Sequence, residues 1–341
     1  MLYVTTRGNE PPQTALHAMN HARGGDGGLY IPVRIPDLSQ EISTWGTKSF
    51  GQATAEILNL FFETRLTGWD VEFAIGRHPV RLLTMSHRIL LTETWHNPTL
   101  DFQGILAELT ALVAPDSAPV PGSWGEIGIR IAALFGIFAE LTAGSRLPWE
   151  GPVDISVASG DFSGPMAAVY AKRMGLPIGN IIVCCNENCA PWDLVCKGEL
   201  KTGAPPMTTA LPECDYPVPP GMERLLFLCG SSSVVFRYLS RAEQGGVYFP
   251  EESVSQALRS LIQVSVVSSR RILSDLPNLY STTGRVFGPY DALTWCGLMD
   301  YRARAGESRL SLVMADHHPQ SDAELVCHAM GLTQDQLNEL L

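Results

Sequence analysis

A strand, a glycine-containing loop, a helix and a second strand follow one another between residues 153 and 185. Val153–Ala158 is an apolar run typical of a buried strand, and the loop Ser159–Gly164 follows it directly. Pro165 favours a helix start, because the first helical position needs no N–H donor. Asn180–Cys185 is the next apolar run. This order predicts a right-handed βαβ crossover and therefore an α/β fold with a parallel sheet.

Further helices are predicted on both sides of this unit. Ser123 and Glu126 have the spacing of a capping box, and apolar residues recur at helical spacing from there to Leu141. The remaining predictions are a helix over 105–113, a helix over 251–273, and proline-rich loops at 114–122 and 203–220.

Composition limits the class of protein. The chain has 341 residues and 45% hydrophobic content, which is sufficient for a large core in one or two domains. A net charge of −11 argues against a nucleic-acid partner. No apolar run is long enough to cross a membrane, and the N-terminus lacks the pattern of a signal peptide. The eight cysteines lack the spacing of a small disulfide scaffold. We expect an acidic, cytoplasmic protein with reduced thiols and no membrane partner.

Several collinear segments carry a resemblance to one enzyme family. Trp95–Gly104 resembles the H-G-P-T-x-x-F-K-D segment of threonine synthases, and Ser159–Gly164 resembles their S-G-N-F-G loop. Other similar segments are Tyr3–Gly8, Asp26–Pro32, Ala171–Ile178, Asn186–Asn188, Met222–Phe227, Gly288–Ala292 and His317–Pro319. Each match alone is weak, but their shared order from residue 3 to about residue 320 is specific. The chain is identified as a member of the threonine synthase family.

The resemblance implies a fold, a cofactor and a reaction. Threonine synthases are enzymes of pyridoxal phosphate (PLP) fold type II, similar to the tryptophan synthase β subunit. They convert O-phospho-L-homoserine and water into L-threonine and phosphate. Their lysine holds the cofactor as a Schiff base, and this chain has Gln103 at that position. An amide cannot condense with an aldehyde or transfer protons as an amine does. PLP, if it binds here, is therefore expected to bind non-covalently.

A second departure from the family follows Gln103. In threonine synthases a smaller subdomain with an S-G-D-T-G loop lies between the lysine segment and the helix that corresponds to 123–141. This chain has one predicted helix and a loop in that interval. We therefore expect an N-terminal segment 1–85, a remnant of the small subdomain at 86–122, and a large α/β domain at 123–341.

Another lysine is not expected to replace the missing one. The chain has four, Lys48, Lys172, Lys197 and Lys201, and all lie in polar or helix-end contexts that predict solvent exposure. A Schiff-base lysine must instead be desolvated in the cofactor cleft.

The cofactor-binding candidates are Ser159, Gly160, Asp161, Phe162, Ser163 and Gly164. A loop between a strand and a helix can offer N–H groups to a phosphate. Asp161 replaces the family's asparagine and would repel that phosphate. The favoured alternative to anion binding is that Asp161 or Ser163 caps the helix.

His96 and Thr99 are the substrate-binding candidates, because they lie in the recognised segment. Arg7 is either a further anion contact or a structural arginine that fixes the N-terminus.

A metal site is not expected. Cys184, Cys185, Cys189 and Cys196 lack the paired knuckles of zinc sites and are better explained as small buried hydrophobic residues. His17 and His21 are spaced by four residues but have no third ligand nearby in the sequence.

Two functions remain open at this point. The first is a non-catalytic threonine synthase-like protein that binds a phosphate-bearing small molecule, regulates, or associates with itself or with a complete threonine synthase. The second is a working PLP lyase of threonine biosynthesis that forms its substrate adduct without a lysine. The loss of the lysine and of the substrate-loop subdomain favours the first.

Overall fold

The computed structural model describes residues 1–86, 88–94, 101–143, 151–306 and 309–341. Its central sheet has six strands among these residues, in the order β3 (Arg81–Ser86), β4 (Ile89–Glu93), β10 (Ser311–Ala315), β5 (Val153–Ala158), β6 (Ile178–Cys185) and β9 (Gln263–Val266). β4, β10, β5, β6 and β9 pair in parallel, and β3 is an antiparallel edge strand. The predicted α/β fold with a mostly parallel sheet is confirmed.

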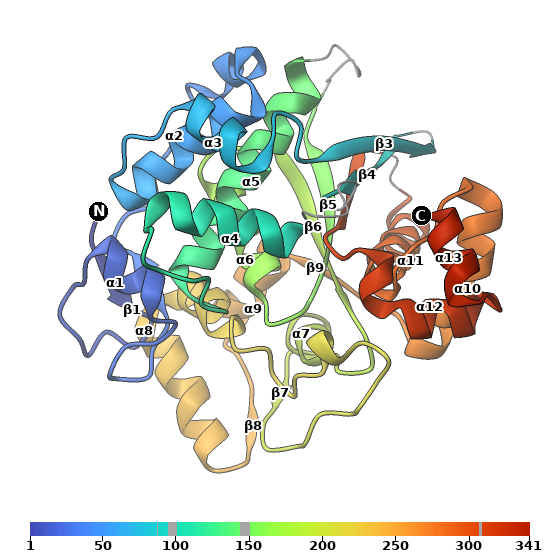
Figure 1. Cartoon of the computed structure of the whole chain (residues 1–341). Helices are drawn as coiled ribbons and strands as arrows, with labels where there is room; N and C mark the ends of the chain where they lie inside the picture. The colour runs from blue at the N-terminus through green and yellow to red at the C-terminus, as the bar shows by residue number, and fades with distance from the viewer. Residues whose placement is uncertain (87, 95–100, 144–150, 307–308) are drawn as a thin grey trace.

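Helices cover both faces of this sheet. One side carries α2 (Phe50–Phe62), α3 (Gly68–Ile75), α4 (Phe102–Val113), α5 (Trp124–Ala143) and α6 (Ser163–Arg173), and the other carries α10 (Ser269–Thr283), α11 (Pro289–Ala305), α12 (Ala323–Met330) and α13 (Gln334–Leu340) (Figure 1). β6 shows why two layers form. Ile181 and Val183 pack in one core cluster, whereas Ile182 and Cys184 pack in the other. Alternate strand residues point to opposite faces, so both faces need a helical cover.

The remaining elements lie outside the central sheet. They are α1 (Ala15–Asn20), α7 (Ala190–Trp192), α8 (Met222–Glu243), α9 (Glu252–Leu261), the antiparallel pairs β1 (Tyr3–Thr5) with β2 (Tyr30–Pro32) and β7 (Leu200–Lys201) with β8 (Val247–Tyr248), and the short turns of helix Ile42–Thr47, Asp193–Lys197, Pro212–Cys214 and Pro319–Asp322. None of the described helices is both long and apolar enough to cross a bilayer.

The predicted βαβ unit is confirmed. β5 has the predicted bounds, α6 begins two residues before Pro165, and β6 pairs with β5 in parallel. The predicted helices over 105–113 and 123–141 correspond to α4 and α5. The predicted segment boundaries stay predictions. The boundary after residue 85 falls within β3, which belongs to the same sheet as β5 and β6.

The single helix predicted over 251–273 is wrong. The structure has α9, then β9, then α10 in this region. The residues between the helices alternate in type, and Val264 lies opposite Val183 of β6. Hydrogen bonding along β6 therefore determines the extended conformation there, and the Ser268 side chain accepts from the Arg271 N–H to start α10.

The predicted capping box at the start of α5 forms only in part. The Ser123 hydroxyl accepts from the Glu126 N–H at 3.3 Å, as predicted. The Glu126 carboxylate, however, accepts from the Gly122 N–H at 2.8 Å. The reason is that the Ser123 N–H already donates to the carbonyl of Val120.

Gly297 allows α11 to lie close against β6. A Cβ atom at this position would stand 2.2 Å from Sγ of Cys184 and 3.0 Å from its Cβ. We expect Gly297→Ala to lower the free energy of unfolding by about 1–2 kcal/mol, since overpacking outweighs the better helix propensity of alanine. Urea denaturation measures this loss. In a Cys184→Ala background the same substitution should cost less, and an equal cost in both backgrounds would contradict the contact.

A candidate ligand cavity at the ends of the parallel strands

A cavity of about 340 Å³ opens beside the carboxyl ends of β5 and β10. Ligands of α/β proteins commonly bind at this edge of the sheet. Its wall includes Ala158 and the loop that follows, the first turns of α4, α5 and α11, and the residues just after β10. The cavity therefore joins segments that are far apart in the chain.

Gln103 lies on the wall of this cavity. It is in the first turn of α4, which begins after Asp101, whose carboxylate accepts from the Gly104 N–H at 2.9 Å. The structure thus brings the lysine-position residue and the glycine loop to one cavity. The substrate-binding candidates His96 and Thr99 lie outside the described residues.

The loop Ser159–Gly164 is closed by its own carboxylate. Asp161 accepts from the Ser163 N–H at 2.8 Å and from the Ser163 hydroxyl at 2.9 Å. Phe162 has a left-handed conformation with φ of 80° and is fully buried. Ser163 is the first residue of α6, so Asp161 satisfies an N–H group that a bound anion would otherwise take.

A chain of charges crosses the cavity wall. Nε of Arg130 donates to Glu126 at 2.8 Å, and its Nη1 lies 3.3 Å from Oδ2 of Asp316. Burial alone would raise the pKa of Glu126, but Arg130 and the Gly122 N–H hold it below its usual value. The arginine in this wall is thus already shared between two carboxylates.

Tyr290 and Asp291 contribute the α11 side of the cavity. The Tyr290 ring stacks on His317 with 4.3 Å between ring centroids. Asp291 is 1% exposed, and its Oδ2 accepts from the Gly288 N–H at 3.3 Å. Its Oδ1 has no hydrogen-bond partner among the described residues. Burial raises the pKa of Asp291 well above its usual value, and the nearby Asp316, Glu93 and Asp322 add to the rise.

None of the four lysines, all of which the structure describes, lines this cavity. Lys48 pairs with Glu56, Lys197 pairs with Asp193 at 2.7 Å, and Lys201 pairs with Glu199 at 3.3 Å.

Lys172 is half-buried instead of fully exposed, and burial lowers its pKa. Its ammonium donates to the carbonyl of Gly179 near the start of β6. That is the end of the strand opposite the cavity, so Lys172 cannot replace the missing amine there.

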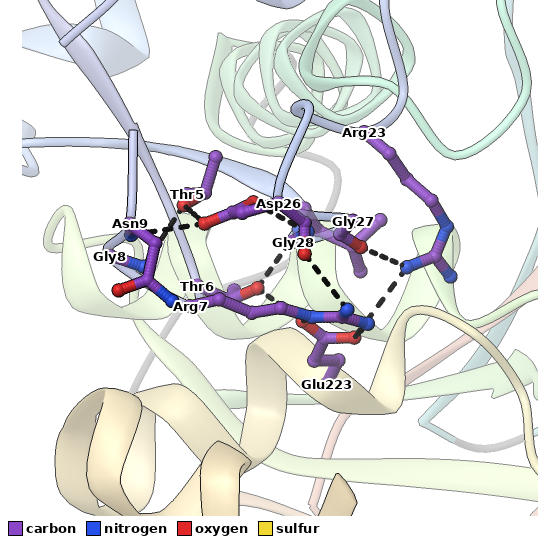
Figure 2. A network of polar contacts seen from close by, with 11 residues as sticks. Thr5, Thr6, Arg7, Gly8, Asn9, Arg23, Asp26, Gly27, Gly28 and Glu223 are labelled. Carbon is purple, nitrogen blue, oxygen red and sulfur yellow. Dashed lines mark hydrogen bonds and ion pairs between the residues drawn. The ribbon is translucent and has the colours of Figure 1, made fainter. Parts of the chain in front are cut away.

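Arg7 belongs to a structural network, shown in Figure 2. Its Nε and Nη2 lie 3.2 and 3.3 Å from the carboxylate of Glu223 in α8, and its Nη1 donates to the carbonyl of Asp26. Thr6 and Arg23 contact the same carboxylate. Of the two roles predicted for Arg7, these contacts support the one that ties down the N-terminal segment.

The other candidate constellations form no metal site. Among the described residues, no group of three or more histidine, cysteine or acidic side chains could hold a metal ion. His17 and His21 stack on each other with 4.1 Å between ring centroids. Cys184 and Cys185 are fully buried, and burial raises the pKa of both thiols. Cys189 is half-buried and Cys196 is exposed, so the prediction of a buried hydrophobic residue is wrong for Cys196, which lies on an outer turn of helix.

Sequence reasoning missed most of the charged wall. Glu126 and Arg130 are spaced by four residues in a predicted helix, which was a readable signal for an ion pair. Asp291 lies inside Gly288–Ala292, and Asp316 directly precedes His317–Pro319. Both segments carry the family resemblance, so their charged residues were available as candidates.

The fold matches that of solved threonine synthases. The PLP-bound threonine synthase from Brucella melitensis superposes with a TM-score of 0.84 at 20% identity, over 100% of this chain and 94% of that one. Threonine synthase from yeast gives a TM-score of 0.82 at 16% identity, over 99% of this chain and 93% of that one. The fold is therefore that of PLP enzymes of fold type II.

Sequence comparison gives the same result. The family described as threonine synthase N terminus matches residues 2–77. Threonine synthase-like 1 from Homo sapiens is 23% identical over 196 residues, which cover 57% of this chain and 26% of that protein. Threonine synthase from Eremothecium gossypii is 24% identical over 229 residues, which cover 62% of this chain and 44% of that protein. In sequence and in fold, the chain is similar to threonine synthases. It covers less than half the length of both relatives.

The residues of this cavity do not fit PLP in the way that the resemblance to threonine synthases implies. Gln103 offers no amine, and no described lining residue is a lysine. Asp161 accepts from the first N–H of α6, and it adds a carboxylate to the loop that the resemblance assigns to the cofactor's phosphate. The mismatch concerns chemistry and charge, because the cavity itself is present.

The contacts of Arg7 and Arg23 with Glu223 lead to a prediction on stability. We expect Glu223→Gln to lower the free energy of unfolding by about 2 kcal/mol, since it leaves Arg7 and Arg23 without their shared charge partner. Urea denaturation measures the change. Glu252→Gln is the matched control, because Glu252 pairs with Arg259 on the exposed surface and should change stability by less than about 0.5 kcal/mol. Equal effects would show that the network carries little of the fold's stability.

A second prediction concerns Asp291 and pH. The pKa of Asp291 is raised in the folded state. When the pH rises above the ordinary value of 3.8, Asp291 therefore ionises in the unfolded chain before it ionises in the folded one, and this destabilises the fold. The loss continues until the pH passes the folded-state pKa. The asparagine of Asp291→Asn cannot ionise. The free energy of unfolding of this variant, relative to that of the wild type, should therefore increase as the pH rises from about 4 to about 8. Denaturation midpoints across this range test it, with exposed Asp335→Asn as the control. A constant difference between Asp291→Asn and wild type would contradict the buried neutral carboxyl.

Proposed function

We propose that this chain is a non-catalytic threonine synthase-like protein that acts as a binding, regulatory or partner subunit. The observation that carries the proposal is that Gln103 and Asp161 face the same cavity. Gln103 replaces the lysine whose amine holds PLP in the family, and the charge of Asp161 would repel the phosphate of PLP. Two independent changes at one site remove the covalent anchor and the anion anchor together.

The rest of the scaffold supports a binding role. The βαβ unit, the two-layer core and the cavity at the strand ends are all present. A chain that keeps a shaped cavity while losing its nucleophile retains the means to bind a ligand or to present a family-like surface to a partner. That partner is a second copy of the chain or a complete threonine synthase.

The decisive experiment is a test for chemistry with PLP and O-phospho-L-homoserine. We expect no threonine and no phosphate release from the wild-type protein. We also expect no borohydride-fixed PLP adduct on any of its four lysines by mass spectrometry. Either product, or an adduct, would contradict the proposal and favour a working PLP lyase.

Two substitutions separate the two losses. Gln103→Lys restores an amine at the cavity, and Asp161→Asn removes the opposing charge. We expect the double variant to form the reducible PLP adduct more readily than either single variant, because the cofactor needs both anchors. Adduct formation in Gln103→Lys alone, equal to that of the double variant, would show that Asp161 does not exclude the phosphate.

A further inference from the structure

The cavity carries an excess of negative charge. Its described lining includes the carboxyl groups of Glu126, Asp161, Glu213 and Asp316, besides that of Asp291, whose raised pKa favours the neutral form. Arg130 is the single arginine in that lining, and it already pairs with Glu126 and Asp316. His317 lies 3.4 Å from Glu213 and can offset that carboxylate when protonated. A bound anion would meet repulsion from most of this wall, whereas a bound cation would be attracted to it.

Two oxygens in the wall lack a hydrogen-bond partner. They are Oδ1 of Asp291, in a residue that is 1% exposed, and Oδ1 of Asp316, neither of which has a partner among the described residues. Buried oxygens of this kind are nearly always paired in folded proteins. Both residues line the cavity, so a ligand with N–H donors would supply the missing partners.

The size and the apolar part of the cavity fit a small organic molecule. Its volume of about 340 Å³ lies at the lower end of the range of small-molecule sites. Leu106, Val157 and Met314 contribute apolar surface. A hydrated metal ion fits less well, since the described residues form no group that could hold a metal.

We propose that this cavity binds a small organic cation, an ammonium or amidinium compound, in place of the phosphorylated cofactor of the family. The inference rests on the proposed function, because a cavity that anchored PLP covalently would have no room for this ligand. The ionised carboxylates provide the charge, the unpaired Oδ1 atoms of Asp291 and Asp316 provide hydrogen-bonding positions, and the apolar wall covers the carbon skeleton.

The probe pair is benzamidine and benzamide, which have the same shape and differ in charge. Isothermal titration of the full chain should show benzamidine binding at least about tenfold more tightly than benzamide. Benzamidine affinity should fall as salt is added. PLP and inorganic phosphate, titrated separately, should bind more weakly than benzamidine. Equal affinity for the neutral and charged probes, or tighter binding of PLP, would overturn the proposal.

Substitutions locate the site. Asp316→Asn and, independently, Asp161→Asn should each weaken benzamidine binding by roughly fivefold to tenfold and leave benzamide nearly unchanged. Two variants are used because Asp316 also contacts Arg130. Asp335→Asn, on the exposed last helix, is the matched control and should bind as the wild type does. An equal loss in the control would place cation binding elsewhere and overturn the proposal.

The binding test for benzamidine is independent of the test for threonine formation. Threonine formation would refute the proposed function whatever binds in the cavity. Absence of threonine together with absence of benzamidine binding would refute the cation site and leave the non-catalytic assignment standing.

Discussion

The dipeptide Glu223-Arg224 at the start of α8 connects three distant parts of the chain. Arg224 is fully buried, with Nε donating to the carbonyl of Tyr30 at 3.0 Å and Nη2 donating to that of Gly122 at 2.9 Å. Burial lowers the pKa of Arg224 to about 10, so the guanidinium still carries its charge at neutral pH. A buried charge is tolerated when its partners are fixed in place. The N-terminal segment and the loop before α5 are therefore held against α8, and that loop positions Glu126 and Arg130 in the cavity wall.

The loop before α6 has an aspartate where the resemblance to threonine synthases implies an asparagine. The N-terminus of a helix attracts anions because its N–H groups and its dipole point outward. In this chain the Asp161 carboxylate meets Ser163 at the start of α6 from within the loop. A tethered carboxylate competes with a free phosphate without losing translational freedom on binding. The loop is therefore closed by a contact within the chain, and its aspartate lines the cavity.

The sequence contained most of the information on local structure and less on the cavity. β5, α6 and β6 were predictable because glycine, proline and apolar runs mark their ends locally. β9 was not, because its extended form depends on pairing with β6, about 80 residues earlier in the chain. The cavity shows the same division. Gln103 and the glycine loop were found through the family resemblance, whereas the contact between Arg130 and Asp316 joins residues separated by 186 positions. No local pattern encodes such a contact.

The core packs without any contribution from the residue at position 103. Ile155 and Val183 lie in the core beneath the strand ends, and neither needs the residue at position 103 to pack. A buried lysine and an unpaired anion site both cost stability, and catalytic proteins tolerate that cost because function requires it. Once the amine is absent, a phosphate anchor without a cofactor brings no compensating benefit. An aspartate that closes the loop then favours the fold, because it satisfies the Ser163 N–H and complements the dipole of α6. The glutamine and the aspartate are therefore physically compatible with each other in a way that neither is with the family's cofactor.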